Sequence, residues 1–352
     1  MYYILSINPG STSTKVALYE DGKKLFTENI EHTREELAGF EKIPDQLEFR
    51  KVLVIKTVMD KGYKLEDLSA IVGRGGLVPN LKTGGYLVNK KMEEVLKSDY
   101  ISAHASNLGG LIAKAIAGPL NIPAYIYDAV TSGELSEVAK ITGMPDVTRQ
   151  SRCHVLNSRA MARKCAEMQG KKYEEMNFIV SHLGGGVSAS AHRNGHIIDS
   201  VADDDGQFSP ERSGSVPLLD VIELCYSGKH TKEEMKQFVR GKGGMYAHLG
   251  TSDCRVIEQR IKDGDQRAKL VFEAQAYQIA KGIGLLSITL LGEVDNIILT
   301  GGVANSTLLT SMIEKYVKFI APVVVLPGEN EMESLANAGL RLLKGEETAK
   351  EY

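Results

Sequence analysis

The chain has 352 residues, of which 43% are hydrophobic and 25% are charged, with a net charge of −3. This length and composition favour a globular protein of two domains, and the weakly acidic balance without a basic arm argues against a nucleic-acid partner. The four cysteines show no close pairing typical of a metal site, and no apolar run is long enough to span a bilayer. These features predict a cytoplasmic protein with reduced thiols and no membrane attachment.

The first twenty residues contain two apolar strands joined by a turn rich in Gly, Ser and Thr. Residues 2–7 lead into the segment Asn8–Lys15, and a second strand follows at 16–19. The N–H groups and hydroxyls of such a turn can bind an anion, and Lys15 adds a positive charge at its end. An empty hairpin explains this composition as well as phosphate binding does, when the turn is taken alone.

Strands alternate with helices through the rest of the first half. Asp21-Gly22 predicts a hairpin turn. Strands are expected at 24–30, 70–72 and 124–127, and helices at 36–61, 90–98 and 104–117. This alternation predicts an α/β fold around a buried, largely parallel sheet.

The second half repeats this order, although the halves share little residue identity. Strands are joined by turns at Gly184–Gly186 and at Asn194-Gly195, the latter typical of a type I′ hairpin. Further strands are expected at 296–300 and 323–326, helices over 216–291 and 331–344, and a frayed tail at 346–352. The repetition predicts a duplicated fold with phosphate held between the halves.

The common phosphate and hydrolase motifs are missing from the sequence. It contains no G-x-x-x-x-G-K-[ST], no G-x-G-x-x-G between a strand and a helix, no zinc spacing and no G-x-S-x-G. Phosphate binding by β-turns therefore remains as the favoured possibility.

Several residues at strand ends have the chemistry that phosphate needs. Three glycines at Gly184–Gly186 weaken a sheet unless a group must approach the backbone closely, and His182 lies beside them. Arg74, between glycines, and Arg212, before a helix, could each neutralise a transferring phosphoryl group. Asp128 follows a strand, where α/β folds place functional groups. Ordinary turns and helix caps are the structural alternatives.

Two more segments have the pattern of helix starts. Gly301–Asn305 follows a strand and opens a helix, and Leu249–Arg255 contains Asp253 at a capping position. Neither segment indicates a function by itself.

In chain order, these motifs resemble the acetate kinase family of the sugar kinase/actin-like ATPase superfamily, most closely its butyrate kinase branch. The resemblance covers essentially the whole chain. The family's two phosphate elements resemble Asn8–Lys15 and His182–Gly186, and its adenosine element resembles Leu299–Asn305. Three such elements in the right order are strong evidence together.

The resemblance implies an α/β fold of two duplicated actin-like (ribonuclease H-like) domains. Each has a mixed central sheet flanked by helices, and the active-site cleft lies between the domains. We place the first domain at residues 1–149, completed by a C-terminal helix at 330–345, and the second at residues 150–329.

The resemblance also implies roles for single residues. Catalytic roles go to Arg74, Asp128, His154, Arg212 and Glu331. The nucleotide and its phosphates are assigned to Asn8, Ser11, Ser13, Lys15, His182, Gly184, Gly185, Gly186, Asp253, Arg255, Gly301, Gly302, Val303 and Asn305. Arg74 and His104 flank the acid substrate, and His154 matches the transition-state histidine. Magnesium is assigned to Asn8, Asp128 and Glu331, partly through water.

Three positions differ from acetate kinase proper. Gly185 stands where that family has asparagine, Arg74 itself precedes the paired glycines, and Ser158 replaces a second histidine. These differences are associated with the butyrate kinase branch.

The implied reaction is reversible: ATP and butyrate, or a similar short or branched-chain fatty acid, give ADP and an acyl phosphate by direct in-line transfer with Mg²⁺. The acid's pKa lies near that of glutamate, ~4.3, so the nucleophile is already ionised and needs no general base. It needs neutralisation of charge instead, which two arginines, a histidine and the metal could supply. The implied partners are a carboxylic acid, an adenine nucleotide and further copies of the chain in a homodimer or larger oligomer.

Three alternatives remain open from the sequence. The first is an acetate or propionate kinase, and the second is a sugar or hydroxyl kinase of the same superfamily, which needs an aspartate base. The third, a non-enzymatic actin-like ATPase, would need an appended client-binding or polymerising element.

Overall fold

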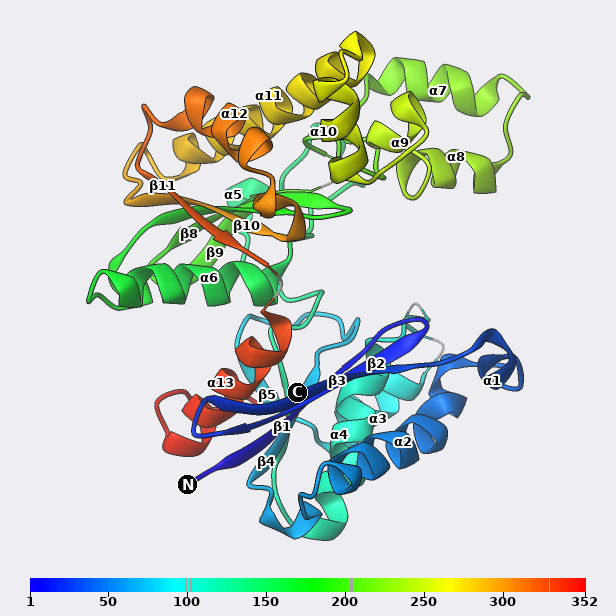
Figure 1. The fold of residues 1–352 in the computed structure, drawn as a ribbon, viewed down its shortest axis with the longest axis vertical. Helices are drawn as coiled ribbons and strands as arrows, with labels where there is room; N and C mark the ends of the chain where they lie inside the picture. Colours follow the sequence, from blue (N-terminus) through cyan, green and yellow to red (C-terminus); the bar gives the residue numbers. More distant parts are fainter. Residues whose placement is uncertain (99, 102, 203–204, 329) are drawn as a thin grey trace. The chain divides into compact units, whose positions relative to one another are not determined.

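Figure 1 shows the computed structural model of the protein, which describes residues 1–98, 100–101, 103–202, 205–328 and 330–352. The chain divides into two compact units, each described here by itself. Unit 1 comprises residues 1–133 and 330–352, and unit 2 comprises residues 134–329.

The division falls after Gly133, whereas the sequence analysis places it after residue 149. The difference arises because the intervening segment bonds to a strand of unit 2. The Ser136 N–H donates to the Ile198 carbonyl (2.9 Å), and Arg149 forms an ion pair with Asp199 (3.1 Å). Such long-range pairings leave no local mark on the sequence of the segment.

Unit 1 is built on a mixed sheet in the order β3-β2-β1-β4-β6-β5. Its strands are β1 (Tyr3–Pro9), β2 (Ser13–Glu20), β3 (Lys23–Glu31), β4 (Ala70–Arg74), β5 (Gly85–Leu87) and β6 (Ala124–Tyr127). Strands β1, β4 and β6 are parallel, and the others pair antiparallel with their neighbours. The carboxyl ends of the parallel strands therefore meet at one edge of the sheet, the usual place for functional groups in such folds.

Helices cover both faces of this sheet (Figure 1). They are α1 (Arg34–Ala38), α2 (Leu47–Asp60), α3 (Lys90–Lys97), α4 (Asn107–Leu120) and α13 (Glu331–Lys344). Successive side chains of β1 point to opposite faces, as a strand requires: Leu5 packs with residues of α2 and α4, whereas Ile4 lies against Gly339 of α13. The expected helix at 36–61 is interrupted, because α1 ends at Ala38 with Gly39 as its C-cap, and a 3₁₀ turn containing Pro44 precedes α2.

The C-terminal tail is ordered against the sheet, so the expectation of a frayed tail is wrong. The Lys350 N–H donates to the Gly85 carbonyl (2.8 Å), and the Leu87 N–H donates to the Lys350 carbonyl (2.9 Å). The Asn89 side chain also donates to the Tyr352 carbonyl (3.3 Å). These bonds satisfy part of the open edge of β5, which stabilises both segments.

Unit 2 has a mixed sheet in the order β11-β10-β7-β8-β9. Its strands are β7 (Phe178–Leu183), β8 (Val187–Arg193), β9 (His196–Val201), β10 (Asn296–Gly301) and β11 (Val323–Pro327). The antiparallel run β9-β8-β7 followed by the parallel strands β10 and β11 matches the run β3-β2-β1 followed by β4 and β6. The duplicated architecture is thus present in the strand order of the two sheets.

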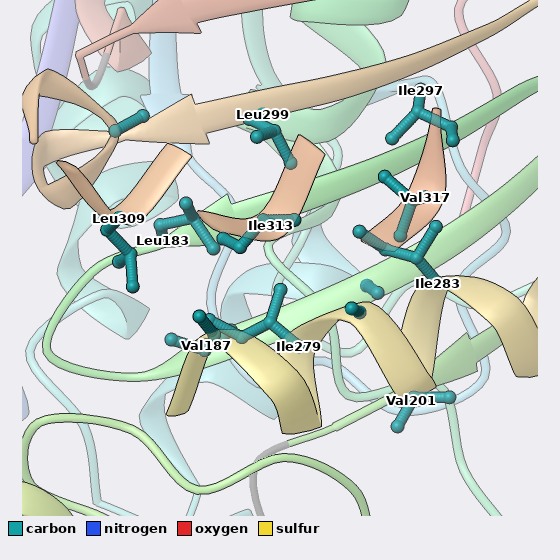
Figure 2. Packing of buried hydrophobic residues seen from close by; sticks show 14 of the residues in the cluster. Leu183, Val187, Val201, Ile279, Ile283, Ile297, Leu299, Leu309, Ile313 and Val317 are labelled. Atoms are coloured by element: carbon teal, nitrogen blue, oxygen red, sulfur yellow. The ribbon is translucent and has the colours of Figure 1, made fainter. Parts of the chain in front are cut away.

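The core of unit 2 lies between its sheet and a long helix. Helices α11 and α12 cover one face and α6 covers the other (Figure 1). Figure 2 shows Ile279 and Ile283 of α11 packed with Leu183, Val187 and Val317. Burial of each such side chain contributes about 1.5–3 kcal/mol, which holds the strand ends that carry the glycine turns.

The helices of unit 2 include the expected helical region at 216–291. They are α5 (Glu137–Lys140), α6 (Val155–Met168), α7 (Leu218–Tyr226), α8 (Lys232–Val239), α9 (Gly244–Leu249), α10 (Cys254–Lys262), α11 (Gln266–Thr289) and α12 (Thr307–Val317). Among the described residues, none of the helices is both long enough and apolar enough to cross a membrane. All four cysteines are free thiols.

Candidate functional site

The first cluster of candidate residues lies at the parallel strand ends of unit 1. Asn8 is near the end of β1, Arg74 ends β4, and Glu331 is the first residue of α13. Glu331 forms an ion pair with Arg74 (3.0 Å) and accepts a hydrogen bond from the Asn8 amide. The Arg74 guanidinium also donates to Asn8 Oδ1 (3.4 Å). One carboxylate therefore orients both side chains, and Arg74 keeps 30% of its side chain exposed to solvent.

Two glycines allow the backbone at Arg74 to lie close against helix α4. A Cβ on Gly109 of α4 would lie 2.4 Å from the Arg74 carbonyl oxygen, and one on Gly73 would lie 2.2 Å from the Gly109 carbonyl oxygen. Only glycine permits this close contact between helix and strand. The contact between Gly73 of β4 and Gly109 of α4 thus fixes the backbone from which Arg74 projects.

Asp128 follows the neighbouring strand β6 in a left-handed conformation, with φ of 43°. Its N–H donates to the Gly84 carbonyl (3.1 Å), and its Oδ1 accepts from the Gly84 N–H (2.7 Å). Residues held in this sparsely populated region persist where the surroundings determine them, and they concentrate at functional sites. Since Arg74 pairs with Tyr127 in the sheet register, Asp128 lies at the same edge as Arg74.

His104 is held by the residue two positions along. The Ser106 N–H donates to His104 Nδ1 (3.2 Å), and the Ser106 hydroxyl lies 2.6 Å from the same nitrogen. Because a backbone N–H can only donate, Nδ1 is an acceptor and the neutral ring carries its proton on Nε2. Burial and the nearby Arg74 guanidinium lower the pKa of His104. The ring can therefore donate one hydrogen bond without adding a charge.

A cavity of about 170 Å³ lies beside the segment that follows Arg74. Its lining is mixed: the apolar residues are Ile43, Pro44, Leu96, Ile101 and Ala103, and the polar ones are Glu41, Lys42, Ser98 and Asn107. A Cβ on Gly76 would lie 3.0 Å from Leu96 Cδ2 and 2.5 Å from Asn107 Oδ1, both from lining residues. The cavity thus adjoins the segment that follows Arg74, and Ala103 precedes His104 directly.

The first anion-binding turn, residues 10–13, lies between β1 and β2. The Gly10 N–H donates to the Ser13 carbonyl (2.8 Å) and closes the turn. Ser11 and Lys15 are exposed, and Ser13 is half-buried. The sequence analysis missed Arg50 of α2, a buried residue whose guanidinium donates hydrogen bonds to the carbonyl groups of this turn.

The glycine turn of unit 2 joins β7 to β8. The Gly184 N–H donates to the Gly186 carbonyl (3.1 Å), and the Gly185 carbonyl accepts from the Ser209 hydroxyl (2.7 Å). A Cβ on Gly186 would lie 2.3 Å from Nη1 of Arg212, so the guanidinium occupies the space that any other residue would fill. Burial, and then the charge of Arg240, lower the pKa of Arg212. The third glycine is therefore needed for the arginine to reach the turn.

Two histidines stack beside this turn. The rings of His154 and His182 lie 3.8 Å apart, at an interplanar angle of 12°. His154 Nδ1 lies 2.8 Å from the Ser188 hydroxyl, and the Asn157 amide nitrogen lies 2.9 Å from His182 Nδ1. With the amide donating, His182 carries its proton on Nε2, on the side of Gly184. The structure thus brings together His154, His182 and the glycine turn.

The third glycine element follows β10. A Cβ on Gly301, where φ is 90°, would lie 2.3 Å from the Leu183 carbonyl oxygen, which explains the requirement for glycine. The Asn305 side chain donates to the Gly302 carbonyl (2.9 Å), and Val303 packs against the core of unit 2.

Asp253 and Arg255 lie at the start of α10. Asp253 caps this helix and forms an ion pair with Arg255 (2.6 Å), and the hydrogen bond from the arginine side chain lowers the pKa of Asp253 to about 2. Helix α10 contacts the segment after Gly301–Asn305, because Ser306 donates to Glu258 (2.5 Å). The two candidate nucleotide elements are therefore linked.

The chain is similar to known proteins over its full length. The model of the acetokinase family matches residues 147–341. Butyrate kinase 1 of Clostridium acetobutylicum is 47% identical over 354 residues, with 100% of each chain covered. The chain belongs to the acetokinase family. Probable butyrate kinase 2 of Caldanaerobacter subterraneus is 48% identical over 353 residues, again with 100% of each chain covered.

Solved structures of the acetokinase family share the fold. Acetate kinase of Porphyromonas gingivalis has a TM-score of 0.82 at 20% identity, covering 97% of this chain and 100% of the other. A propionate kinase of Francisella tularensis has a TM-score of 0.77 at 18% identity, covering 96% and 99%. The expected two-sheet actin-like α/β fold is confirmed.

The residues at the strand ends of unit 1 suit a magnesium ion. Asp128, Glu331 and Asn8 offer oxygen atoms, which are the ligands that Mg²⁺ prefers, and this metal usually keeps several waters and takes one or two carboxylates. Among the described residues, no group of three or more His, Cys, Asp or Glu side chains could hold a metal.

Three supporting residues were missed by the sequence analysis: Arg50, Asn157 and Ser188. Asn157 stands one helical turn after His154, so a polar residue at this spacing is a signal that could have been used. Ser188 alternates with core residues of β8. No feature of the sequence around Arg50 marks it as a residue that supports the turn.

The two roles of Asp128, shaping the turn and carrying a charge, can be separated. In Asp128→Asn, Oδ1 still accepts the Gly84 N–H, and asparagine tolerates the left-handed conformation. We expect an unchanged melting temperature and a turnover reduced by about 100-fold or more, because a charge at the reacting groups is lost. Steady-state kinetics and thermal unfolding measure both, and wild-type turnover in the folded variant would contradict the assignment.

The contact between the glycine turn and Arg212 is tested with Gly186→Ala. The added methyl group displaces the guanidinium by about an ångström or more, and a misplacement of this size costs about 100-fold in turnover. Gly284→Ala is the matched control, since a Cβ on Gly284 of α11 meets no atom within 4 Å. Equal turnover of the two variants would show that the contact is dispensable.

Proposed function

We propose that this protein is an ATP-dependent carboxylate kinase that acts on butyrate or a similar short or branched-chain fatty acid. The reaction converts the acid and ATP to an acyl phosphate and ADP, reversibly. The observation that carries the proposal is the cluster of Asn8, Arg74 and Glu331. It presents an oriented guanidinium whose planar set of N–H donors can bind an acceptor that is already ionised. The near-50% identity with butyrate kinases over the full chain supports the same acceptor.

In this proposal, unit 1 binds the acid and unit 2 binds the nucleotide. Arg74 holds the carboxylate, and Nε2 of His104 donates a hydrogen bond to it. The glycine turn at 184–186 and Arg212 hold the phosphates, and His154 stabilises the charge of the transferring group. A carboxylate oxygen attacks the γ-phosphorus in line, the new O–P bond forms, and the bond to the β-phosphate oxygen breaks with release of ADP.

The rate of this reaction depends on charge neutralisation, because no proton is transferred. The Asn8 amide cannot act as a base at neutral pH, and an ionised carboxylic acid needs none. Asp128, Glu331 and Asn8 would hold Mg²⁺, partly through water. When bound, this ion neutralises phosphate charge and helps to orient the transferring group.

The finer properties belong to the same proposal. We assign the protein to the cytoplasm and to a homodimer or a larger homo-oligomer. Helix α7 supports the assembly, since Leu218, Leu219 and Tyr226 are each more than two thirds exposed on it. Apolar surface of this kind commonly marks a contact with another chain.

The decisive experiment is a hydroxamate assay for acyl phosphate with acids from acetate to valerate, alongside glucose and glycerol in a coupled ADP assay. We expect acyl phosphate with butyrate and its neighbours in size, and no ADP release with the polyols. Activity on a polyol alone would identify a hydroxyl kinase. Absence of product with every acid would overturn the proposal.

The cavity beside Ala103 makes a prediction about chain length. An apolar cavity of ~150 Å³ can hold benzene, so about 170 Å³ is sufficient for a propyl chain. Ala103→Leu narrows this cavity, and we expect the KM for butyrate to rise about tenfold while the KM for acetate changes little, since such contacts discriminate by ~1–3 kcal/mol.

Ala38→Leu is the matched control, because it adds the same side chain at an exposed position of α1 outside the cavity lining. The KM for acetate, butyrate and valerate is measured in the wild type and in both variants. Equal changes for all three acids in Ala103→Leu would contradict the assignment of the cavity to the acyl chain.

A further inference from the structure

Arg50 of α2 is fully buried behind the anion-binding turn of unit 1. Only 1% of this residue's surface is exposed to solvent. Nη1 donates to the carbonyls of Gly10 and Ser13 (both 2.9 Å), and Nη2 donates to the carbonyl of Ser11 (3.2 Å). Nη1 also donates to the Thr14 hydroxyl (3.0 Å). One guanidinium therefore bonds to every part of the turn except Thr12.

The charge of Arg50 is not matched by a carboxylate among these hydrogen-bond partners. Its remaining bonds, from Nε (3.0 Å) and Nη2 (2.8 Å), go to the neutral Gln46 side chain. Buried arginines are ordinarily paired with acids. Burial lowers the pKa of Arg50 to about 10, so it stays charged at neutral pH, and burial and this guanidinium lower the pKa of nearby His32. Among the described residues, every hydrogen-bond partner of Arg50 is neutral, so the turn lies against a buried positive charge.

The hydrogen bonds of Arg50 also fix the direction of the amide N–H groups. No peptide bond among the described residues is cis, so the N–H and C=O of each peptide point in opposite directions. The carbonyl of Gly10 belongs to the same peptide as the N–H of Ser11, and the carbonyl of Ser11 to that of Thr12. Because Arg50 binds these carbonyls, the N–H groups of Ser11 and Thr12 point away from it.

We infer that Arg50 is a positioning residue that turns the N–H groups of Ser11 and Thr12 outward to bind phosphoryl oxygens and adds its own positive charge behind them. The inference deepens the proposed function, on which the kinetic part of its test rests. Successive N–H groups aimed in one direction form an anion-binding concavity. The group bound there is a phosphate or the phosphoryl end of an acyl phosphate.

Two variants of Arg50 and one control test the inference. Arg50→Met removes the charge and all hydrogen bonds, and Arg50→Lys keeps the charge but loses the planar fork that reaches several carbonyls. Lys51→Met is the matched control, since Lys51 is the next residue of α2 and pairs with Glu48 (2.6 Å) rather than with the turn.

The first measurement needs no turnover. Inorganic phosphate is titrated into each protein while the backbone amide resonances of Ser11 and Thr12 are followed by NMR. We expect phosphate-dependent shifts in the wild type and in Lys51→Met, weaker shifts in Arg50→Lys, and none in Arg50→Met. Absence of shifts at both amides in the wild type would overturn the inference.

The second measurement is kcat and KM with butyryl phosphate and ADP, together with thermal unfolding. We expect kcat to fall about 100-fold in Arg50→Met and about tenfold in Arg50→Lys, with the KM for ADP unchanged. A variant that is less stable but has wild-type kcat and phosphate shifts would reduce Arg50 to a structural role and overturn the inference. If Arg50→Met does not fold, Arg50→Lys decides in the same way.

The two proposals can fail separately. A wild-type protein that makes no acyl phosphate but shows the phosphate shifts would remove the proposed function and keep the role of Arg50. A protein that makes acyl phosphate with equal kcat in all variants would keep the function and remove the role of Arg50.

Discussion

The carboxylate of Glu331 makes the interaction on which the cluster of Asn8, Arg74 and Glu331 depends. It bonds to Asn8, 323 positions earlier in the chain, and to Arg74, so it ties the last helix to two parallel strands. The contact needs α13 to lie close on the sheet, and Gly339 permits this, since a Cβ there would lie 2.7 Å from Val72. The pairing of the C-terminal tail with β5 secures the other end of the helix. The close packing that Gly339 permits thus positions Glu331, and Glu331 in turn orients the Arg74 side chain.

Close approach to the backbone is the physical reason for several of the glycines near functional groups. Gly109 accommodates the carbonyl of Arg74, Gly186 accommodates the guanidinium of Arg212, and Gly301 accommodates the carbonyl of Leu183. In each case a neighbouring atom occupies the place that a Cβ would take. Substitution to alanine at these positions changes where a functional group lies, and this is distinct from the cost in backbone entropy alone.

Much of this architecture could be predicted from the sequence, because strand periodicity and glycine turns are local signals. The turn at Gly184–Gly186 and the strand end at Arg74 are of this kind, and both lie where the pattern indicates. The boundary at Gly133 and the ordered tail could not be predicted, since both depend on hydrogen bonds to distant strands. Arg50 could not be predicted either, because a buried arginine is rare and nothing adjacent marks it.

The two arginines of unit 1 differ in how their charge is compensated. Arg74 is paired with Glu331, so it contributes direction and hydrogen bonds but little net charge. Arg50 bonds to neutral groups, so its charge is free to act on an anion at the turn. Two like charges 4 Å apart repel by about 4 kcal/mol near a protein surface. A reaction that joins a carboxylate to a phosphoryl group must offset this repulsion, and the role that we infer for Arg50 is to contribute to this offset without acting as a base.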